Sequence, residues 1–184
     1  MSSRRSPKAG SARPRKSWPA ITGSGKKASI RFSLNTPIEA IPAVTTIGVF
    51  ASIFDTAGHA LCIRQNYGAR YWTTPGGRLE TGEAPADGLI REVREEIGAE
   101  IAIAGLIGAY ANPYKDDLIL CFATKLLTSL KGWRPHAEID ALDFFPLDRL
   151  PQPMTANTQW RLRDGAAGRR GLYRVFDGPD QLRA

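Results

Sequence analysis

The sequence is poor in the residues that mark secreted and metal-binding proteins, because its 184 residues include two cysteines and two histidines. Cys62 and Cys121 both lie in apolar runs typical of strands. We expect them to be buried free thiols, which indicates a reducing, cytoplasmic compartment. His59 and His136 lie near predicted turns and lack metal-ligand spacing. We therefore assign neither histidine a role.

Long apolar segments are also missing. The longest uncharged stretch with a strong apolar run, Ile41–Phe54, has 14 residues and contains Pro42. A helix that crosses a bilayer needs about 20 apolar residues, so the sequence predicts no membrane span. The content of the stretch is instead typical of a first core strand.

Acidic residues are absent from positions 1–38. This segment holds nine of the 25 lysines and arginines, so the remaining chain has 16 basic and 18 acidic residues and the net charge of +7 originates in the segment. It is rich in serine, glycine and proline and has few large apolar residues, which predicts a disordered basic tail. An organelle transit peptide and a nucleic-acid tether stay open as alternatives. The low aromatic content, Trp18 and Phe32, does not favour base stacking.

The rest of the chain has enough apolar sequence for one domain with a full core. Strands are predicted from β-branched and aromatic runs at Thr46–Phe54, Ala60–Gln65, Tyr71–Trp72, Ile101–Tyr110, Leu118–Leu126 and Leu142–Phe145. The first two should form a hairpin around a turn at residues 55–58. Helices are predicted at Pro85–Ile97, in a short turn at Pro146–Leu150, and from an N-cap at Thr155 to about Asp164. This order predicts an α/β domain with a mixed sheet and helices on its faces.

The helix predicted at Pro85–Ile97 carries three glutamates on one side. At about 100° per residue, its apolar residues form a stripe that can pack on a core, namely Ala86, Leu89, Ile90, Val93 and Ile97. Glu92 is three residues from Glu95 and four from Glu96, so the three carboxylates are neighbours. Arg91 precedes Glu95 by four residues and can fix its carboxylate. Hard divalent cations prefer carboxylate oxygens, so this face is suited to cations that bind phosphates and activate water.

This helix is part of a longer pattern with fixed intervals. Five residues separate Gly77 from Glu83, seven separate Glu83 from Arg91, and the run continues as Arg-Glu-Val-Arg-Glu-Glu-Ile-Gly-Ala. The pattern resembles the signature of the Nudix hydrolases, Gly-x5-Glu-x7-Arg-Glu-U-x-Glu-Glu-x-Gly-U, in which U is an apolar residue. The matching positions are Gly77, Glu83, Arg91, Glu92, Val93, Glu95, Glu96 and Gly98. Ala99 departs from the pattern because it is smaller than the usual aliphatic residue. We call residues 77–99 the Nudix box.

The resemblance covers about Ala43–Asp177. It implies a Nudix-type αβα sandwich with a mixed β-sheet at residues 43–177, following the tail at residues 1–38. It also implies that Glu92, Glu95 and Glu96 ligate Mg²⁺ or Mn²⁺ and are the catalytic residues, and that Glu92 or a loop acid takes the proton from water. Supporting roles for the loop and the substrate are implied for Gly76, Gly77, Glu83 and Arg91.

Outside the Nudix box the sequence offers only candidates. The candidates for a further acid are Asp116, Asp117 and Glu138, of which Glu138 resembles a recurring family glutamate. The aromatic candidates for base stacking are Trp72, Tyr114 and Phe144, although strand aromatics usually belong to the core. Pro113 lies 14 residues after Ala99, close to a position that marks some ADP-ribose hydrolases.

The resemblance implies a pyrophosphohydrolase that cleaves a nucleoside diphosphate linked to another moiety. Its small-molecule substrate stays open, with an ADP-ribose-like compound and a nucleoside triphosphate as examples, because specificity is set by loops outside the box. Two alternatives remain, a catalytically silent nucleotide sensor and an RNA 5′-end pyrophosphohydrolase that uses the basic tail. No membrane partner is expected, and the oligomeric state is open and includes a homodimer.

Overall fold

The computed structural model describes residues 45–136 and 138–183. The elements follow the order β1 (Thr46–Ile53), β2 (Ala60–Gln65), β3 (Trp72–Thr73), β4 (Gly76–Arg78), α1 (Pro85–Ile97), β5 (Ile101–Asn112), the 3-10 turn η1 (Pro113–Lys115), β6 (Asp117–Leu126), β7 (Ile139–Phe145), α2 (Ala156–Ala166), β8 (Leu172–Gly178) and β9 (Gln181–Leu182). The predicted tail at residues 1–38 lies outside the described residues.

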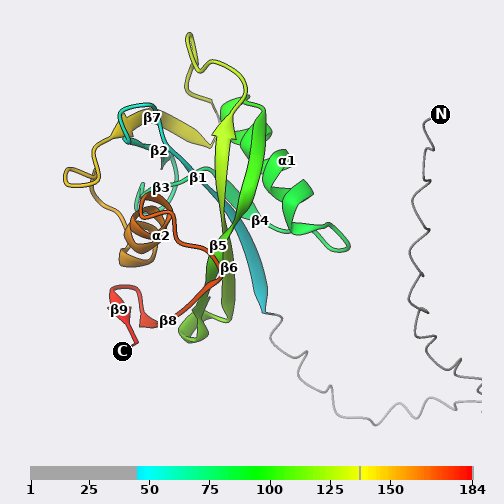
Figure 1. Ribbon diagram of the computed structural model, residues 1–184, viewed down its shortest axis with the longest axis vertical. Coiled ribbons are helices and arrows are strands. Elements are labelled where there is room, and N and C mark those ends of the chain that lie inside the picture. The colour runs from blue at the N-terminus through cyan, green and yellow to red at the C-terminus, as the bar shows by residue number, and fades with distance from the viewer. Residues whose placement is uncertain (1–44, 137, 184) are drawn as a thin grey trace, which may run out of the picture. The chain divides into compact units, whose positions relative to one another are not determined.

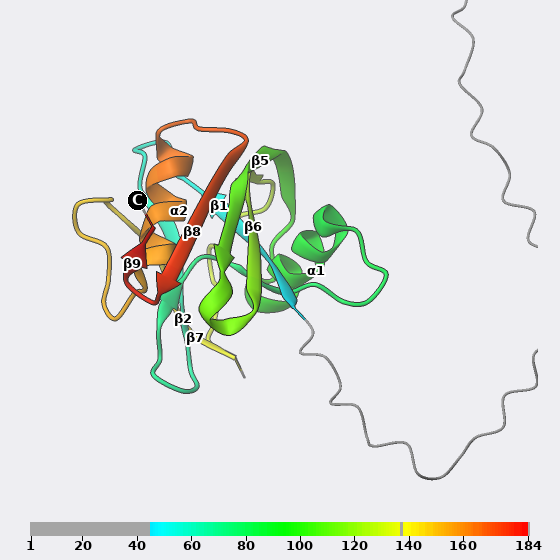
Figure 2. The ribbon, with the colours of Figure 1, turned by 90° about the horizontal axis from the view of Figure 1, so that it is seen from below.

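The main sheet is mixed, as predicted. Its six strands have the order β4-β1-β6-β5-β8-β9. Strand β1 pairs in parallel with β6, which pairs antiparallel with β5, and β5 pairs in parallel with β8. Figures 1 and 2 show α1 on one side of this sheet and α2 on the other. The predicted α/β fold class, with helices on both faces of a mixed sheet, is confirmed.

The predicted hairpin of β1 and β2 is wrong. A single bridge between Phe54 and Ala60 joins the two strands, and β2 then enters a second sheet with the order β3-β2-β7. The turn itself forms, because the Asp55 carboxylate accepts hydrogen bonds from the backbone N–H groups of Ala57 and His59. The burial of β1 explains the separation: Ala51, Ser52 and Ile53 are buried in succession, as in a strand covered on both faces.

Other differences concern short or exposed segments. Strands β4, β8 and β9 were not predicted. The segment Pro146–Leu150 is a turn closed by a hydrogen bond from Arg149 N–H to the Pro146 carbonyl, not a helix. One hydrogen-bonded turn gives too little cooperative stabilisation for a helix to continue.

Helix α1 has the predicted bounds and packs by the predicted stripe. Leu89, Val93 and Ile97 are buried in the main core cluster together with residues of β1, β2 and β5. Its last turn ends at Gly98, whose φ of 66° is left-handed and suits a residue without a side chain. The residues that begin and end the helix in the sequence and the residues that pack in the core therefore define the same helix, α1.

Helix α2 begins as predicted at an N-cap, since the Thr155 hydroxyl accepts a hydrogen bond from Thr158 N–H. Its Asp164 side chain is fully buried and joins three elements. The carboxylate accepts hydrogen bonds from the Tyr110 hydroxyl of β5 at 2.9 Å and from Arg174 Nε of β8 at 2.6 Å. Asp164 therefore connects α2 to strands β5 and β8 of the sheet.

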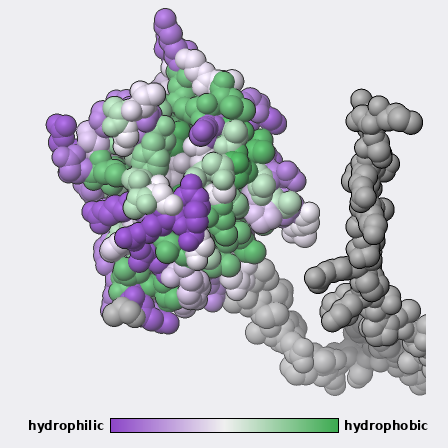
Figure 3. Space-filling view, viewed as in Figure 1, coloured by the Kyte–Doolittle hydropathy of each residue, from purple (hydrophilic) through white to green (hydrophobic). Residues whose placement is uncertain are grey.

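Both cysteines are buried free thiols, as predicted. Burial raises the pKa of Cys62 and of Cys121 to about 12, which keeps them in the unreactive thiol form. No helix among the described residues is long and apolar enough to span a membrane. On the face seen in Figure 3, hydrophobic and hydrophilic residues are interspersed, which is ordinary for a folded protein surface.

Candidate active site

The site begins at two glycines of β4, which lies between β1 and the glutamates of α1. Gly76 has a φ of 135°, and a Cβ there would lie 2.6 Å from the Phe50 Cα of β1. A Cβ on Gly77 would lie 2.6 Å from the Cδ of Glu92. A side chain on Gly76 would push β4 away from β1, whereas a side chain on Gly77 would displace the Glu92 carboxylate. The two glycines thus bring the backbone of β4 against the glutamates of α1.

Glu96 is the most buried carboxylate of α1. Its side chain accepts a hydrogen bond from Gly76 N–H at 2.7 Å, and the residue is 8% exposed. Burial raises the pKa of Glu96 to about 8, the hydrogen bond opposes this, and the negative charges of Glu92 and Glu138 raise it further. An ionised Glu96 is therefore costly unless positive charge lies nearby.

Glu92 and Glu96 both line a cavity of about 430 Å³, which we call the inner cavity. Burial raises the pKa of Glu92, and the Arg91 guanidinium partly opposes the shift. The cavity is lined by residues of β1, β2, β4, α1, η1 and β6 and of the loops before β3 and β7. Its polar lining comprises Thr46, Gln65, Tyr67, Arg78, Glu92, Glu96, Lys115, Asp117 and Glu138. The structure thus brings several carboxylates into one pocket with few cations.

Arg91 holds the acidic loop and helix together. Its Nε and Nη2 each donate to the Glu83 carboxylate at 3.0 Å, and Nη1 donates to Glu92 and Glu95, both at 3.0 Å. Nη2 also donates to the Arg78 carbonyl. These bonds raise the pKa of the Arg91 guanidinium and lower that of Glu83. The arginine therefore fixes the orientation of three glutamates that the sequence singled out, Glu83, Glu92 and Glu95.

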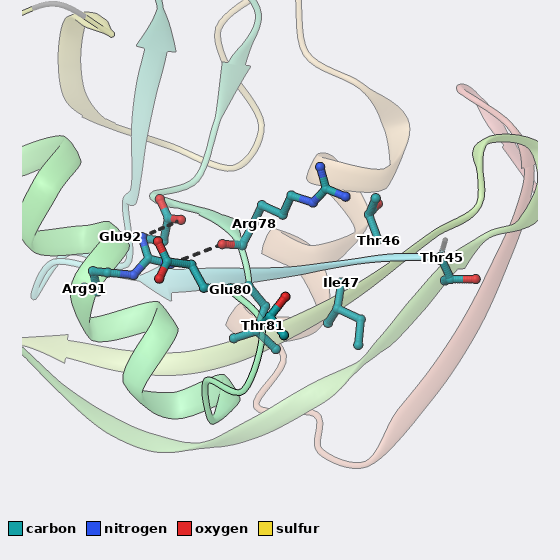
Figure 4. A pocket seen from close by; sticks show the side chains of 9 residues that line it. Thr45, Thr46, Ile47, Arg78, Glu80, Thr81, Arg91 and Glu92 are labelled. Atoms are coloured by element: carbon teal, nitrogen blue, oxygen red, sulfur yellow. Dashed lines mark hydrogen bonds and ion pairs between the residues drawn. The ribbon is translucent and has the colours of Figure 1, made fainter. Parts of the chain in front are cut away.

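A wider pocket of about 820 Å³ adjoins the first one (Figure 4). Both are lined by Thr46, Ile47, Arg78 and Glu92. Figure 4 shows the Arg78 side chain extending across β1 toward Thr46, while Glu92 lies beside Arg91 on the helix. Glu92 and the cationic Arg78 therefore line both the inner cavity, which also contains Glu96, and the wider pocket.

Glu95 differs from its two neighbours. Its side chain is 59% exposed and bonded to Arg91, and it does not line either of these cavities. Among the residues that the structure describes, no group of three or more histidine, cysteine, aspartate or glutamate side chains is arranged to hold a metal ion. The structure thus brings Glu92 and Glu96 together and leaves Glu95 outside, so the three-glutamate metal site stays a prediction.

A family model described as the NUDIX domain matches residues 44–164. The chain belongs to the NUDIX domain family. The enzyme class predicted from the Nudix box, a Nudix pyrophosphohydrolase acting on phosphorus anhydrides, is confirmed at this level. The match ends before β8, so the predicted bounds of the domain at residues 43–177 stay a prediction.

Several known proteins are similar to this Nudix chain. A MutT-like protein of Streptomyces ambofaciens is 30% identical over 79% of this chain and 93% of its own. An ADP-ribose pyrophosphatase of Methanocaldococcus jannaschii is 31% identical over 42% of this chain and 47% of its own, and an 8-oxo-dGTP diphosphatase of Proteus vulgaris is 39% identical over 25% and 41%. A solved Nudix hydrolase from Nitrosomonas europaea has a TM-score of 0.62 and 19% identity, covering 72% of this chain and 79% of that one, which supports the fold.

The remaining sequence candidates separate in the structure. Glu138 is exposed and lines the inner cavity, as does Asp117, whose carboxylate is 3.1 Å from Lys115 Nζ. Asp116 is exposed, with a left-handed φ of 51°. Of the aromatic candidates, Trp72 and Tyr114 line a third cavity of about 180 Å³, whereas Phe144 packs against the main core.

Some lining residues were not candidates from the sequence. Tyr67 and Lys115 line the inner cavity with Gln65, yet they come from loops or strand ends that share no periodic pattern with the Nudix box. His136, to which the sequence assigned no role, contacts the Glu96 carbonyl through Nε2. This contact lies at the C-terminal turn of α1, where orphan carbonyls need donors.

Replacing Arg91 tests its positioning role. We expect Arg91→Met to lower kcat/KM by about 10- to 100-fold, the usual cost of losing a group that orients a ligand residue. The matched control is Arg94→Met, because Arg94 lies on the same helix but pairs with Glu100, away from the inner cavity. Steady-state kinetics with both variants measures the effect. Equal losses in the two variants would contradict a positioning role for Arg91.

Proposed function

We propose that this Nudix chain is a divalent-metal-dependent hydrolase that cleaves the pyrophosphate bond of a nucleoside diphosphate linked to another moiety. The single observation that carries the proposal is the convergence of Glu92 and Glu96 on one cavity. Burial raises the pKa of each carboxylate, and a divalent cation would supply the missing positive charge. Gly77 of β4 has no side chain, which leaves the nearby Glu92 carboxylate accessible from that strand.

The donor set fits Mg²⁺ or Mn²⁺, which prefer carboxylate and water oxygens. Glu92 and Glu96 would hold the ion from the inner cavity, and Glu95 would join them if Arg91 released its carboxylate. A bound cation would neutralise phosphate charge and lower the pKa of a water molecule. The carboxylates that line the inner cavity are the kind of ligand that such a cation requires.

The other residues supply binding and proton transfer. Lys115 and Arg78 line the inner cavity and can neutralise phosphate oxygens of the substrate. Glu138 or Glu92, which both line the inner cavity, would accept the proton of the attacking water at a carboxylate oxygen. Arg91 and Glu83 keep the helix and the preceding loop in a fixed orientation through their paired hydrogen bonds.

Removal of metal ions is the first test. We expect EDTA-treated protein to show no hydrolysis of any pyrophosphate substrate, because phosphoryl chemistry depends on charge neutralisation. Adding Mg²⁺ or Mn²⁺ should restore activity, with Na⁺ at matched ionic strength as the control. Turnover that survives chelation would overturn the proposed metal dependence.

A substrate panel gives the second half of this test. Release of phosphate or nucleoside monophosphate should be measured for nucleoside triphosphates, oxidised purine nucleotides, ADP-ribose, NADH, dinucleoside polyphosphates and capped RNA. Similarity to proteins named as 8-oxo-dGTP diphosphatase and ADP-ribose pyrophosphatase supports including both substrate types. No product from any of these with Mg²⁺ or Mn²⁺ would favour a catalytically silent sensor.

A further inference from the structure

The loop between β2 and β3 brings a tyrosine to the inner cavity. Tyr67 lines this cavity, and so do three carboxylates, those of Glu92, Glu96 and Glu138. The tyrosine is 56% exposed, so its ring contributes little to the hydrophobic core. Core packing therefore does not explain why a tyrosine lies beside these acids.

The loop is held on both sides of Tyr67. Asn66 N–H donates to the Glu138 carbonyl at 2.8 Å, and Arg70 N–H donates to the Tyr67 carbonyl at 3.0 Å. The Arg70 guanidinium also forms an ion pair with Asp140 of β7. These contacts join the loop to β7 and to the segment before it. The backbone that carries Tyr67 is therefore ordered before a ligand binds, which lowers the entropy that binding must overcome.

The hydroxyl of Tyr67 has a proton to donate. Its oxygen accepts a hydrogen bond from Gln65 Nε2 at 2.8 Å, and an amide nitrogen can only donate. The hydroxyl proton therefore points away from Gln65, and no residue that the structure describes accepts it. Burial raises the pKa of Tyr67, and the negative charges of three glutamates raise it further, namely Glu96, Glu138 and Glu92. The hydroxyl thus stays protonated at neutral pH.

A neutral donor is suited to a cavity with several carboxylates. A lysine or arginine at this position would pair with the carboxylates and compete with the proposed divalent cation for their oxygens. A hydroxyl carries no charge, so it can donate to a phosphate oxygen and leave the carboxylates available to the cation. A hydrogen bond to an ionised acceptor such as phosphate is about twice as strong as one between neutral groups.

We infer that Tyr67 is a further substrate-binding residue, whose hydroxyl donates a hydrogen bond to an oxygen of the pyrophosphate group in the inner cavity. Gln65 is its positioning residue, because the amide occupies one side of the phenol oxygen and directs the proton to the other. The inference rests on the proposed function, since it assigns a contact to the diphosphate that the enzyme would cleave.

Binding of a diphosphate analogue that cannot be hydrolysed tests this contact. Calorimetry with the full chain at saturating Mg²⁺ should measure the affinity for methylenediphosphonate. We expect Tyr67→Phe, which removes only the hydroxyl, to weaken binding by about tenfold, the usual effect of losing a hydrogen bond to a charged group. Equal affinities of Tyr67→Phe and the wild type, or no binding to the wild type, would overturn the inference.

The matched control is Tyr71→Phe. Tyr71 ends the same loop but lines the third cavity and not the inner one. Its substitution should leave the affinity for methylenediphosphonate within about twofold of the wild type, as expected for a change away from the contact. A tenfold loss in Tyr71→Phe as well would mean that the loop responds to any lost hydroxyl, which would contradict a specific contact of Tyr67.

Double-mutant cycles identify what the hydroxyl contacts. The loss caused by Tyr67→Phe should persist at about tenfold in a Glu138→Met background. If the loss disappears there, the hydroxyl acts by holding the Glu138 carboxylate, and the inference is wrong. In a Gln65→Met background the loss should shrink, because the hydroxyl then lacks its fixed direction. An unchanged loss in that background would contradict the positioning role of Gln65.

The inference and the proposed function fail separately. If methylenediphosphonate binds through Tyr67 but no substrate is hydrolysed, the phosphate contact stands and the proposed reaction is wrong. If substrates are hydrolysed but Tyr67→Phe binds methylenediphosphonate as tightly as the wild type does, the reaction stands and the contact is wrong.

Discussion

Glu96→Gln should lower kcat by about 10³-fold while the protein stays folded. The substitution removes a negative charge that the proposed metal ion would require, and metal-centred charge stabilisation contributes several kcal/mol, at about tenfold per 1.36 kcal/mol. The glutamine Oε1 can still accept the hydrogen bond from Gly76 N–H that Glu96 accepts at 2.7 Å. Steady-state kinetics at saturating Mg²⁺, with circular dichroism as the folding check, measures the effect.

The control for this prediction is Glu100→Gln. Glu100 follows the same helix, and its side chain is 46% exposed and pairs with Arg94. Its substitution should leave kcat within about twofold of wild type, as expected for a surface change. Glu95→Gln gives a graded comparison, because Glu95 is more exposed and is held by Arg91. Wild-type rates in Glu96→Gln would remove Glu96 from the catalytic machinery.

The features that could be predicted from the sequence are those with local causes. Helix α1 has the predicted bounds because Pro85 and Gly98 punctuate it and its apolar stripe repeats at helical spacing. The N-cap at Thr155 is equally local. These signals depend on a few neighbouring residues and need no knowledge of the sheet.

The pairing of the strands could not be predicted in the same way. Whether β1 pairs with β2 or β6 depends on which faces become buried, and the turn at Asp55 is compatible with either outcome. Strand β8 pairs with β5 in parallel across a separation of about 60 residues in the chain, and its residues are mostly half-exposed, so it lacks an apolar run.

The same limit applies to the site. Helical spacing makes Glu92, Glu95 and Glu96 neighbours, but the approach of β4 decides which of them is buried, and Gly76 selects Glu96. Arg161 and Asn157 belong to α2 and are buried against the sheet, Arg161 over the Phe50 ring of β1 and Asn157 bonded to Asn112 of β5. A polar residue on a short helix gives no sequence signal of burial, so the burial of these two side chains was found only in the structure.

Asp164→Asn should destabilise the fold by about 3 kcal/mol, because removing one partner of a buried ion pair leaves the other charge uncompensated. The carboxylate is fully buried and bonded to Arg174, Arg169 and Tyr110. Urea unfolding near neutral pH measures the change in free energy. Asp177→Asn is the matched control, since its exposed pair with Arg183 should contribute about 0–1 kcal/mol.

The pH dependence separates this charge effect from simple loss of packing. Burial raises the pKa of Asp164, but the hydrogen bonds from Arg174 and Tyr110 outweigh it, so the folded-state pKa lies below the ordinary value. A carboxyl with a depressed pKa stabilises the fold above its unfolded pKa of about 3.9, and this contribution is lost as the pH falls through the folded pKa. The difference between wild type and Asp164→Asn should therefore be largest near neutral pH and shrink progressively below about pH 4. A difference that stays constant over the acid range would mean that Asp164 acts through shape and not through its charge.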